Sequence, residues 1–238
     1  MSNQEGHKHL MSQTVAEINS IFSEIGFVFA EGPEREKISF NFDYLNVPKD
    51  HPSRDMQDTF YLEADPELVM RTHTSPVQIR YMQNHQPPIR MICPGKVFRN
   101  EATDATHEAQ FFQIEGLMID KNISLRHMKG VLEYFFTKYF GDTVEVRFRP
   151  SFFPFVEPGI EVDMKIEANK NNKLSGRWIE IMGAGMVHPN VLRAAGVDPE
   201  VYQGFAFGGG IDRLIVLRYG LDDIRLMYNG DLRFVNQF

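Results

Sequence analysis

Residues 204–213 read Gly-Phe-Ala-Phe-Gly-Gly-Gly-Ile-Asp-Arg, and this stretch joins a strand-like segment to the start of a helix. Glycines at such a junction let a ligand approach the backbone closely, and the N-terminus of a helix favours a phosphate group. Arg213, in the first turns of the helix, adds a full positive charge. A glycine-rich turn alone more often binds nothing, so the meaning of this stretch depends on the rest of the chain.

Apolar periodicity and turn residues outline the elements on either side. Helical spacing, with caps at Thr14 and Ser75, predicts helices at 14–25, 75–85, 124–140, 189–195 and 209–219. Residues 34–57 are expected to be loop, and strand patterns fall at 27–29, 59–62, 89–92, 96–99, 111–119, 144–149, 160–166 and 178–182. Because strands outnumber helices and do not alternate strictly with them, we expect an α+β fold, a mainly antiparallel β-sheet flanked by helices.

The composition is that of an ordinary globular protein. The chain has 238 residues, of which 42% are apolar, and 25 Lys and Arg stand against 32 Asp and Glu, for a net charge of −7. A single cysteine, Cys93, excludes a disulfide scaffold and a cysteine-based zinc site, and favours a reducing compartment. No signal peptide and no membrane-length apolar run is present, so we expect a cytoplasmic chain without a membrane partner. The acidic balance argues mildly against a protein that coats nucleic acid.

Several familiar enzyme signatures are absent. The sequence contains no G-x-x-x-x-G-K-[ST] phosphate loop, no G-x-S-x-G nucleophile elbow and no H-E-x-x-H metal motif. Its glycines at 208–210 do not complete a G-x-G-x-x-G spacing. Cys93 is better explained as a small core residue than as a nucleophile. A conventional nucleophilic or metal-dependent hydrolase is therefore not expected.

Two further charged features precede the glycine-rich stretch. Arg99 stands at a strand end beside a polar loop, where it could clamp a phosphate or form an ordinary surface pair with Glu101. By the two-residue period of a strand, Phe111, Gln113 and Glu115 share one face, while the opposite face is apolar and packs on the core. The first face suits an aromatic base and an ammonium group, but a solvated strand face fits the pattern equally well.

Three segments resemble, in this order, the signature motifs of class II aminoacyl-tRNA synthetases: the helix and strand at about 12–33, Arg99 with its loop and the following strand at about 96–119, and the glycine-rich stretch at about 204–219. The runs at 71–78, 103–115, 149–158 and 183–190 are similar to the α-subunit family of bacterial-type phenylalanyl-tRNA synthetases. The similarity extends from about residue 10 to residue 238, so we expect a single class II synthetase catalytic domain over 1–238. The family's N-terminal coiled-coil arm is expected to be missing, whether the domain is excised or naturally short.

The resemblance implies ATP-dependent activation of L-phenylalanine to phenylalanyl-adenylate, followed by transfer to the 2′-hydroxyl of the terminal adenosine of tRNA(Phe). No protein nucleophile is required, because the substrate carboxylate attacks the α-phosphorus. Arg99 and Arg213 match the family's catalytic arginines, and Mg²⁺ is expected to accompany ATP. The positions that match the ATP site are Arg99, Glu101, His107, Phe111 and Arg213.

The resemblance also implies a phenylalanine pocket. In it, Glu115 is the natural partner of the α-ammonium group, and Phe153 and Phe155 grip the substrate ring edge-to-face. The matching positions are His73, Ser75, Gln78, Gln113, Glu115, Phe153, Phe155, Val156, Ala206 and Gly208. Glu157 and Glu180 are candidate magnesium ligands. Gln57 occupies a position, just before Asp58, that holds an aromatic residue in some relatives, at one edge of the ATP pocket.

The family works as an (αβ)₂ assembly, so the resemblance implies a β subunit and the acceptor end of tRNA(Phe) as partners. Motif 1 helices form subunit interfaces in this class, which makes a homodimer contact through motif 1 the other arrangement to test. An alternative function is a non-catalytic, synthetase-like binding or regulatory module. Such modules usually lose the motif 2 or motif 3 arginine, whereas this chain keeps Arg99 and Arg213. A plain nucleic-acid-binding domain would need a basic stripe that the sequence lacks.

Overall fold

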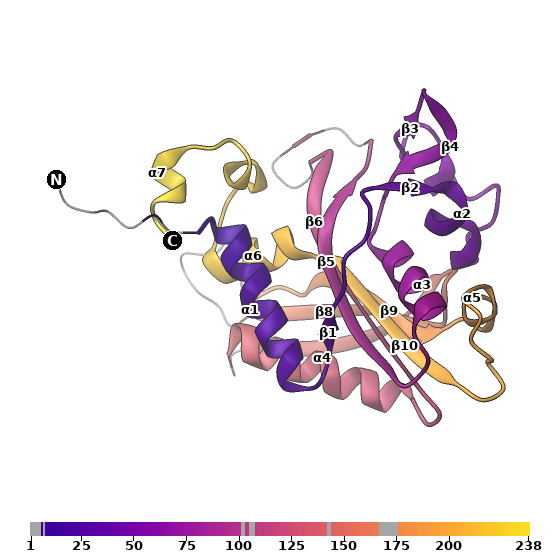
Figure 1. The fold of residues 1–238 in the computed structure, drawn as a ribbon. Coiled ribbons are helices and arrows are strands. Elements are labelled where there is room, and N and C mark those ends of the chain that lie inside the picture. The colour runs from indigo at the N-terminus through magenta and orange to yellow at the C-terminus, as the bar shows by residue number, and fades with distance from the viewer. Residues whose placement is uncertain (1–5, 7, 101–102, 105–107, 142–143, 167–175) are drawn as a thin grey trace.

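The computed structural model of the protein describes residues 6, 8–100, 103–104, 108–141, 144–166 and 176–238. Its centre is a seven-stranded sheet in the order β1-β5-β6-β10-β9-β8-β7 (Figure 1). β1 runs parallel to β5, and the other neighbours are antiparallel. The strands are β1 (Val28–Phe29), β5 (Ile89–Phe98), β6 (Gln110–Asp120), β7 (Val144–Phe153), β8 (Val156–Ile166), β9 (Ile179–Val187) and β10 (Gln203–Gly210). This confirms the expected α+β fold.

One face of the sheet is covered by α1 (Leu10–Glu24), α4 (Leu125–Phe140) and α6 (Ile211–Tyr219) (Figure 1). The core between these layers is aromatic: Phe22 stacks on Phe207 with ring centroids 5.5 Å apart and on Phe135 at 5.0 Å. A Cβ atom at Gly116 would lie 2.2 Å from the Phe207 ring, so only glycine lets this ring pack against β6.

The opposite face carries a second apolar cluster with α3 (Ser75–Asn84) and α5 (Pro189–Ala194). Met91 of β5 and Leu117 of β6 pair across the sheet and point into this cluster. Because successive strand residues alternate between faces, Ile114 joins the first cluster while Glu115 turns toward α3. The division of Phe111–Glu115 into two faces that the sequence predicts is thus confirmed.

The expectation of a loop at 34–57 is wrong. The segment contains β2 (Arg35–Lys37), α2 (Ile38–Asn41) and the 3₁₀ turns η1 (Asp43–Leu45) and η2 (Pro52–Arg54). Strand β2 joins β3 (Tyr61–Leu62) and β4 (Asp65–Met70) in a small sheet with the order β2-β4-β3. Tertiary contacts hold these short elements in place. Buried Glu36 accepts two hydrogen bonds from the Arg80 guanidinium, at 2.9 and 2.5 Å.

Several element boundaries also differ from the sequence prediction. α1 begins at Leu10, where the His9 ring accepts from the backbone N–H of Met11, and Thr14 is buried inside the helix. The strands expected at 89–92 and 96–99 are one strand, β5. The Ser124 cap of α4 is confirmed, with His127 completing the capping box. The chain ends with η3 (Ile224–Met227) and α7 (Leu232–Val235), and no helix in the described ranges is long and apolar enough to span a bilayer.

Candidate active site

A strip of small residues crosses the middle of the large sheet on the face that carries α3. Gly208 of β10 pairs with Glu115 of β6 on one side and with Gly183 of β9 on the other. Two residues before Gly208 on β10, Ala206 pairs with Gly185 of β9. Paired residues of neighbouring strands point to the same face. Gly183, Gly185 and Gly208 therefore form a stretch of bare backbone, which we call the glycine floor.

Two side chains reach over the glycine floor. A Cβ atom at Gly208 would lie 2.7 Å from Cγ of Glu115, and one at Gly183 would lie 2.9 Å from Cζ of Phe153. Real Cβ atoms essentially never approach so closely, so a larger residue at either position would displace these groups. The floor thus fixes an acidic group at one end of the site and an aromatic ring at the other.

Glu115 is buried and is held by two donors from α3. The hydroxyl of Ser75 and the amide of Gln78 both donate to Oε2 of Glu115, each at 2.6 Å. The expectation that Ser75 caps its helix through its hydroxyl is wrong, since Thr74 is the cap residue and the hydroxyl bonds to Glu115 instead. Burial raises the pKa of Glu115 to about 7, even though both donors lower it. A cation placed beside the carboxylate would offset that penalty.

Two more polar atoms, on Gln113 and His73, lack a partner within the described part of the chain. Oε1 of Gln113 and Nδ1 of His73 are both buried and accept or donate no hydrogen bond there. Gln113 pairs with Gly210 on β10, one pair from Glu115 on the same face. Burial, with a contribution from the Arg99 charge, lowers the pKa of His73 to about 3, so the ring is neutral. Buried polar groups normally find partners, so these two atoms are available to a polar ligand or to water.

The aromatic end of the site lies at the turn between β7 and β8. The rings of Phe153 and Phe155 are stacked, with centroids 5.9 Å apart, and Phe155 lies 6.5 Å from the His73 ring. Asn46 holds this turn by donating to the Pro154 carbonyl at 2.7 Å. Asn46 has φ 59°, a left-handed conformation that asparagine tolerates well. Sequence reasoning missed Asn46, because 108 residues separate it from its acceptor.

Small and apolar residues complete the floor near the aromatic pair. Val156 is buried, and a Cβ atom at Gly185 would lie 2.8 Å from the Val156 side chain. Ala206 stands beside Gly185 and opposite Leu117. The structure therefore brings the residues matched to the phenylalanine pocket into one site, with polar groups at one end and apolar groups at the other.

The described residues matched to the ATP site lie near the start of β6 and at the start of α6. The Arg99 guanidinium lies over the Phe111 ring, 5.1 Å from its centroid, and Nε of Arg99 donates to the Thr72 carbonyl at 3.3 Å. Arg213 follows the end of β10, in the first turn of α6, and donates to the Glu180 carbonyl at 2.9 Å. The predicted ligands Glu101 and His107 lie outside the described residues.

The two candidate magnesium ligands are far apart. Glu157 follows Val156, which pairs with Val187 at one end of β9, whereas Glu180 pairs with Asp163 at the other end. The structure therefore does not bring the two carboxylates together. Among the described residues, no group of three or more His, Cys, Asp or Glu side chains is placed to hold a metal ion.

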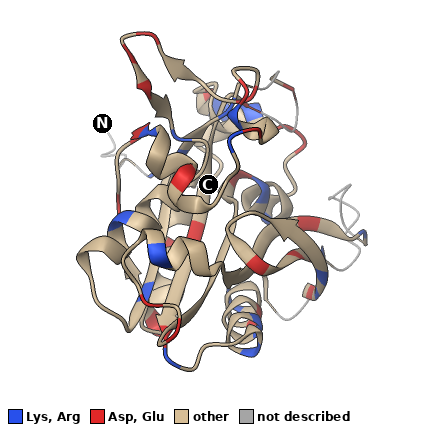
Figure 2. Cartoon of the chain, turned by 90° about the vertical axis from the view of Figure 1, so that its right-hand side faces the viewer, with Lys and Arg blue, Asp and Glu red and all other residues tan. Residues whose placement is uncertain are grey.

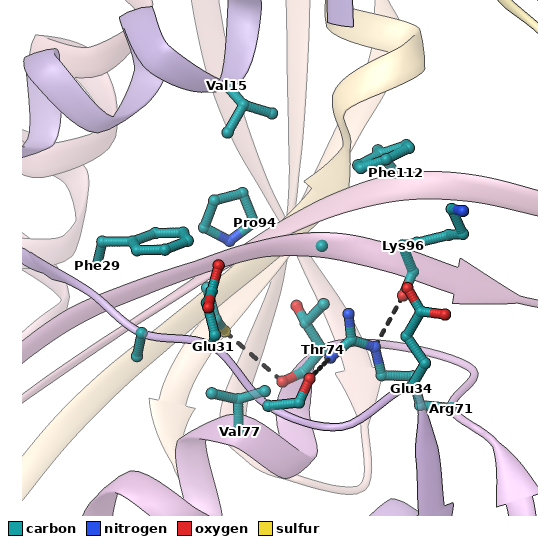
Figure 3. Close-up of a pocket in the computed structure, with 14 residues that line it drawn as sticks. Val15, Phe29, Glu31, Glu34, Arg71, Thr74, Val77, Pro94, Lys96 and Phe112 are labelled. Carbon is teal, nitrogen blue, oxygen red and sulfur yellow. Dashed lines mark hydrogen bonds between the residues drawn. The ribbon is translucent and has the colours of Figure 1, made fainter. Parts of the chain in front are cut away.

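A cavity of about 400 Å³ lies behind this site, against the edge strand β1 (Figure 3). Buried Arg71 borders it, donating from Nε to the Lys96 carbonyl at 2.7 Å and from Nη1 to the Gly32 carbonyl at 3.0 Å. Cys93 also lines the cavity; burial raises the pKa of its thiol, which agrees with the expected core role. Arg71 is a second residue that sequence reasoning missed, since its acceptors, the carbonyls of Gly32, Pro33 and Lys96, are backbone atoms.

The chain is similar in sequence to known proteins of one family. The family model described as tRNA synthetases class II core domain (F) matches residues 1–238. A phenylalanine–tRNA ligase alpha subunit of Clostridium perfringens (strain SM101 / Type A) is 55% identical over 238 residues, 98% of this chain and 69% of that protein. The alpha subunit of Caldanaerobacter subterraneus subsp. tengcongensis is 52% identical over 237 residues, again 98% and 69%.

Solved structures agree at the level of the fold. A crystal structure of pyrrolysyl-tRNA synthetase from Desulfitobacterium hafniense superposes with a TM-score of 0.71 over 95% of this chain and 76% of that one, at 17% identity. A second structure of that organism's pyrrolysyl-tRNA synthetase, PylSc, gives 0.70 at 16% identity, over 94% and 72% of the two chains. At such low identity the likeness shows a shared catalytic-domain fold and carries no argument about the substrate.

Proposed function

The chain belongs to the α-subunit family of phenylalanine–tRNA ligases, within the class II synthetases, and we propose that the site on the glycine floor is where it activates phenylalanine. A carboxylate oxygen of phenylalanine attacks the α-phosphorus of ATP, and pyrophosphate leaves with the bonding electron pair. The 2′-hydroxyl of the terminal adenosine of tRNA(Phe) then attacks the acyl carbon, and AMP leaves. The protein supplies position and charge for both steps rather than a nucleophile.

The observation that carries this proposal is the buried carboxylate of Glu115, for which the cost of burial outweighs the nearby charge of Arg71. Its Oε2 is held by Ser75 and Gln78, and burial has raised its pKa to about 7. An α-ammonium group beside the carboxylate would supply a further cation, and Oε1 of Gln113, which has no partner among the described residues, would accept a second N–H. Ser75 and Gln78 then act by orienting Glu115, which refines the direct substrate contact that the resemblance implied for them.

The other end of the floor fits the phenyl ring. Phe153 and Phe155 offer aromatic surface, and Val156 and Ala206 offer only apolar atoms. A tyrosine substrate would bury its hydroxyl among these groups without a hydrogen-bond partner, which costs free energy. Apolar pockets reject an added hydroxyl only modestly, so we expect preference for phenylalanine rather than absolute exclusion of tyrosine.

Arg99, Phe111 and Arg213 support the proposed ATP site. Arg99 lies over one face of the Phe111 ring and can bridge the substrate carboxylate and the α-phosphate, while the other ring face is offered to adenine. Arg213 lies next to the N-terminus of α6, where the helix dipole also favours phosphate. Opposite charges placed before the reaction stabilise the charge that develops on the phosphorus oxygens. We propose Glu101 and His107 as further ATP contacts from the motif 2 loop.

Mg²⁺ would neutralise ATP phosphates in this reaction, but the described residues do not form a protein site for it. Glu157 lies on β8 and Glu180 on β9, at opposite ends of the ladder that joins these two strands, and no acidic cluster accompanies either of them in the described ranges. No step of the mechanism above therefore passes through a protein-bound metal. That Glu157 or Glu180 binds Mg²⁺ stays a prediction, which metal titration of the Glu157→Gln and Glu180→Gln variants tests.

A partner subunit is part of the proposal. The relatives are named alpha subunits, and the exposed edge strand β1 presents Val28 and Phe29, at 47% and 45% exposure, beside the cavity of Figure 3. We propose that a β subunit covers this edge, with a second copy through motif 1 as the arrangement to distinguish from it. Light scattering of the chain alone and with β added separates a homodimer from a heteromeric complex.

The tRNA contacts are expected to be local. Figure 2 shows Lys and Arg interspersed with Asp and Glu over the visible side, and the chain carries a net charge of −7. This distribution suits a domain that receives only the acceptor end of tRNA. Because the reaction consumes ATP and tRNA, the proposal places the chain in the cytoplasm.

Phenylalanine-dependent exchange of pyrophosphate into ATP tests the proposed function. We expect exchange by the chain together with a β subunit, and loss of exchange when phenylalanine is omitted. Absence of exchange both with and without β would favour the non-catalytic module, even though Arg99, Arg213 and Glu115 are retained.

A further inference from the structure

A second buried carboxylate lies outside the phenylalanine pocket. Asp212, in the first turn of α6, is 4% exposed and immediately precedes Arg213. Its Oδ2 accepts from the backbone N–H of Phe112 at 2.7 Å, and its Oδ1 accepts from the hydroxyl of Tyr228. Nothing in the proposed chemistry uses this carboxylate directly. It links three separate parts of the chain.

The bond to Phe112 continues the sheet beyond the end of a strand. β10 ends at Gly210, which pairs with Gln113, and the chain then turns into α6. The pairing of β10 with β6 therefore ends before Phe112, whose N–H comes next along β6. The Asp212 carboxylate takes the place of a strand acceptor for this N–H. Helix α6 is thereby fixed to β6 at the point where Phe111 begins the proposed adenine face.

The bond to Tyr228 brings in the C-terminal segment. Tyr228 follows η3, which lies outside all three signature motifs, and it is buried enough that its pKa is raised. Burial also raises the pKa of Asp212 to about 6, while the two donors oppose that change. A carboxylate is costly to bury, and an apolar residue would pack the same space without that penalty. Because this carboxylate accepts two hydrogen bonds from different segments, it fixes the relative positions of β6, α6 and the segment that carries Tyr228.

We propose that Asp212 and Tyr228 are positioning residues that set the relative placement of Phe111 and Arg213, two residues of the proposed ATP site. The inference rests on the proposed function for the identity of the ligand. Tyr228 holds the Asp212 carboxylate in one orientation, and Asp212 in turn fixes the strand that carries Phe111 and the helix that carries Arg213. The C-terminal segment is therefore a structural part of nucleotide binding.

The test compares Tyr228→Phe, Asp212→Asn and Asp212→Leu with a control, Tyr219→Phe. Tyr219 lies on α6, the helix that carries Asp212, and its ring contacts Phe238. The enzyme with its β subunit is assayed for KM of ATP, KM of phenylalanine and kcat in pyrophosphate exchange. The Kd for ATP is measured separately by calorimetry, and folding is monitored by circular dichroism.

We expect Tyr228→Phe to raise KM and Kd for ATP about 3- to 10-fold, with KM for phenylalanine within about twofold of wild type. Asp212→Leu should have the larger effect. Asp212→Asn should keep most of the wild-type affinity for ATP. Its amide oxygen can accept from the Phe112 N–H, and its amide nitrogen can donate to the Tyr228 hydroxyl, which then acts as the acceptor. Tyr219→Phe should match wild type.

The proposal is overturned if Tyr228→Phe binds ATP like wild type. It is also overturned if the two KM values rise together in step with a loss of folded protein, since that pattern describes general destabilisation. Failure of wild type to exchange pyrophosphate would instead contradict the proposed function. In that case the ATP Kd values of the same variants still decide whether Asp212 and Tyr228 position the nucleotide site.

Discussion

Replacing Glu115 by Gln should make the chain more stable and the enzyme much less active. In the folded chain burial raises the Glu115 pKa from 4.5 to about 7. Each tenfold change in proton affinity is worth about 1.4 kcal/mol, so ionised Glu115 costs the ligand-free fold about 3 kcal/mol. An amide of the same shape carries no such cost, and its oxygen can still accept from Ser75 and Gln78.

The pH dependence of this stability difference has a definite sign. Below pH 4.5 the carboxyl is protonated in both the folded and unfolded chains, so wild type suffers no penalty. As pH rises from 4.5 to about 7, the unfolded chain loses its proton first and wild type is progressively destabilised. The gain in stability of Glu115→Gln should therefore be near zero at pH 4 and reach its full value above pH 7.

Activity should change in the opposite direction. The ammonium group of phenylalanine loses a charged acceptor, and hydrogen bonds to charged groups are worth about 1.5–3 kcal/mol. We expect kcat/KM for phenylalanine to fall about 10- to 150-fold. KM for ATP should change little, because Arg99, Phe111 and Arg213 are untouched.

Denaturant unfolding at pH 5 and pH 8 and pyrophosphate exchange at pH 8 measure the two effects. Asp163→Asn is a useful control, because Asp163 is a buried acid on the same sheet whose pKa is lowered by Arg149. That variant should lose stability at pH 8. A Glu115→Gln variant that was both less stable at pH 8 and fully active would refute the role assigned to this carboxylate.

Three further substitutions test other parts of the site. Ala206→Gly should enlarge the apolar end and admit para-chlorophenylalanine, seen as exchange dependent on that analogue; unchanged discrimination would contradict the placement of Ala206. Arg99→Lys should lower kcat at least about 100-fold with little change in Tm, since a lysine cannot bridge two oxygens as a guanidinium does; near-normal kcat would remove Arg99 from the mechanism. Asn46→Ala should loosen the turn that carries Phe153 and raise KM for phenylalanine about fivefold while leaving KM for ATP alone; equal changes in both would show a structural role only.

Local patterns were sufficient for much of the fold. The Ser124 cap and the apolar stripe behind it predicted α4, and strand alternation placed Gln113 and Glu115 on the correct face. These features depend on residues that are neighbours in sequence. The segment at 34–57 could not be predicted in this way, because its short elements are stabilised by distant contacts such as the Glu36–Arg80 pair.

Long-range contacts also limited the prediction of the site. Ser75 has the sequence signature of a helix cap, but its hydroxyl bonds to Glu115, which is 40 residues away. Tyr228 and Asn46 carry no local signal, and their roles appear only when the fold brings them to Asp212 and Pro154. Sequence similarity proposed the pocket residues, whereas the structure shows which of them hydrogen-bond to one another.

The central claim is that the buried Glu115 carboxylate is completed by the ammonium group of phenylalanine. Calorimetric titration of phenylalanine at pH 6.5, in two buffers of different ionisation enthalpy, measures the protons released on binding. With a pKa of about 7 before binding and full ionisation afterwards, wild type should release about three-quarters of a proton, and Glu115→Gln should release none. Binding by wild type without proton release would contradict the account.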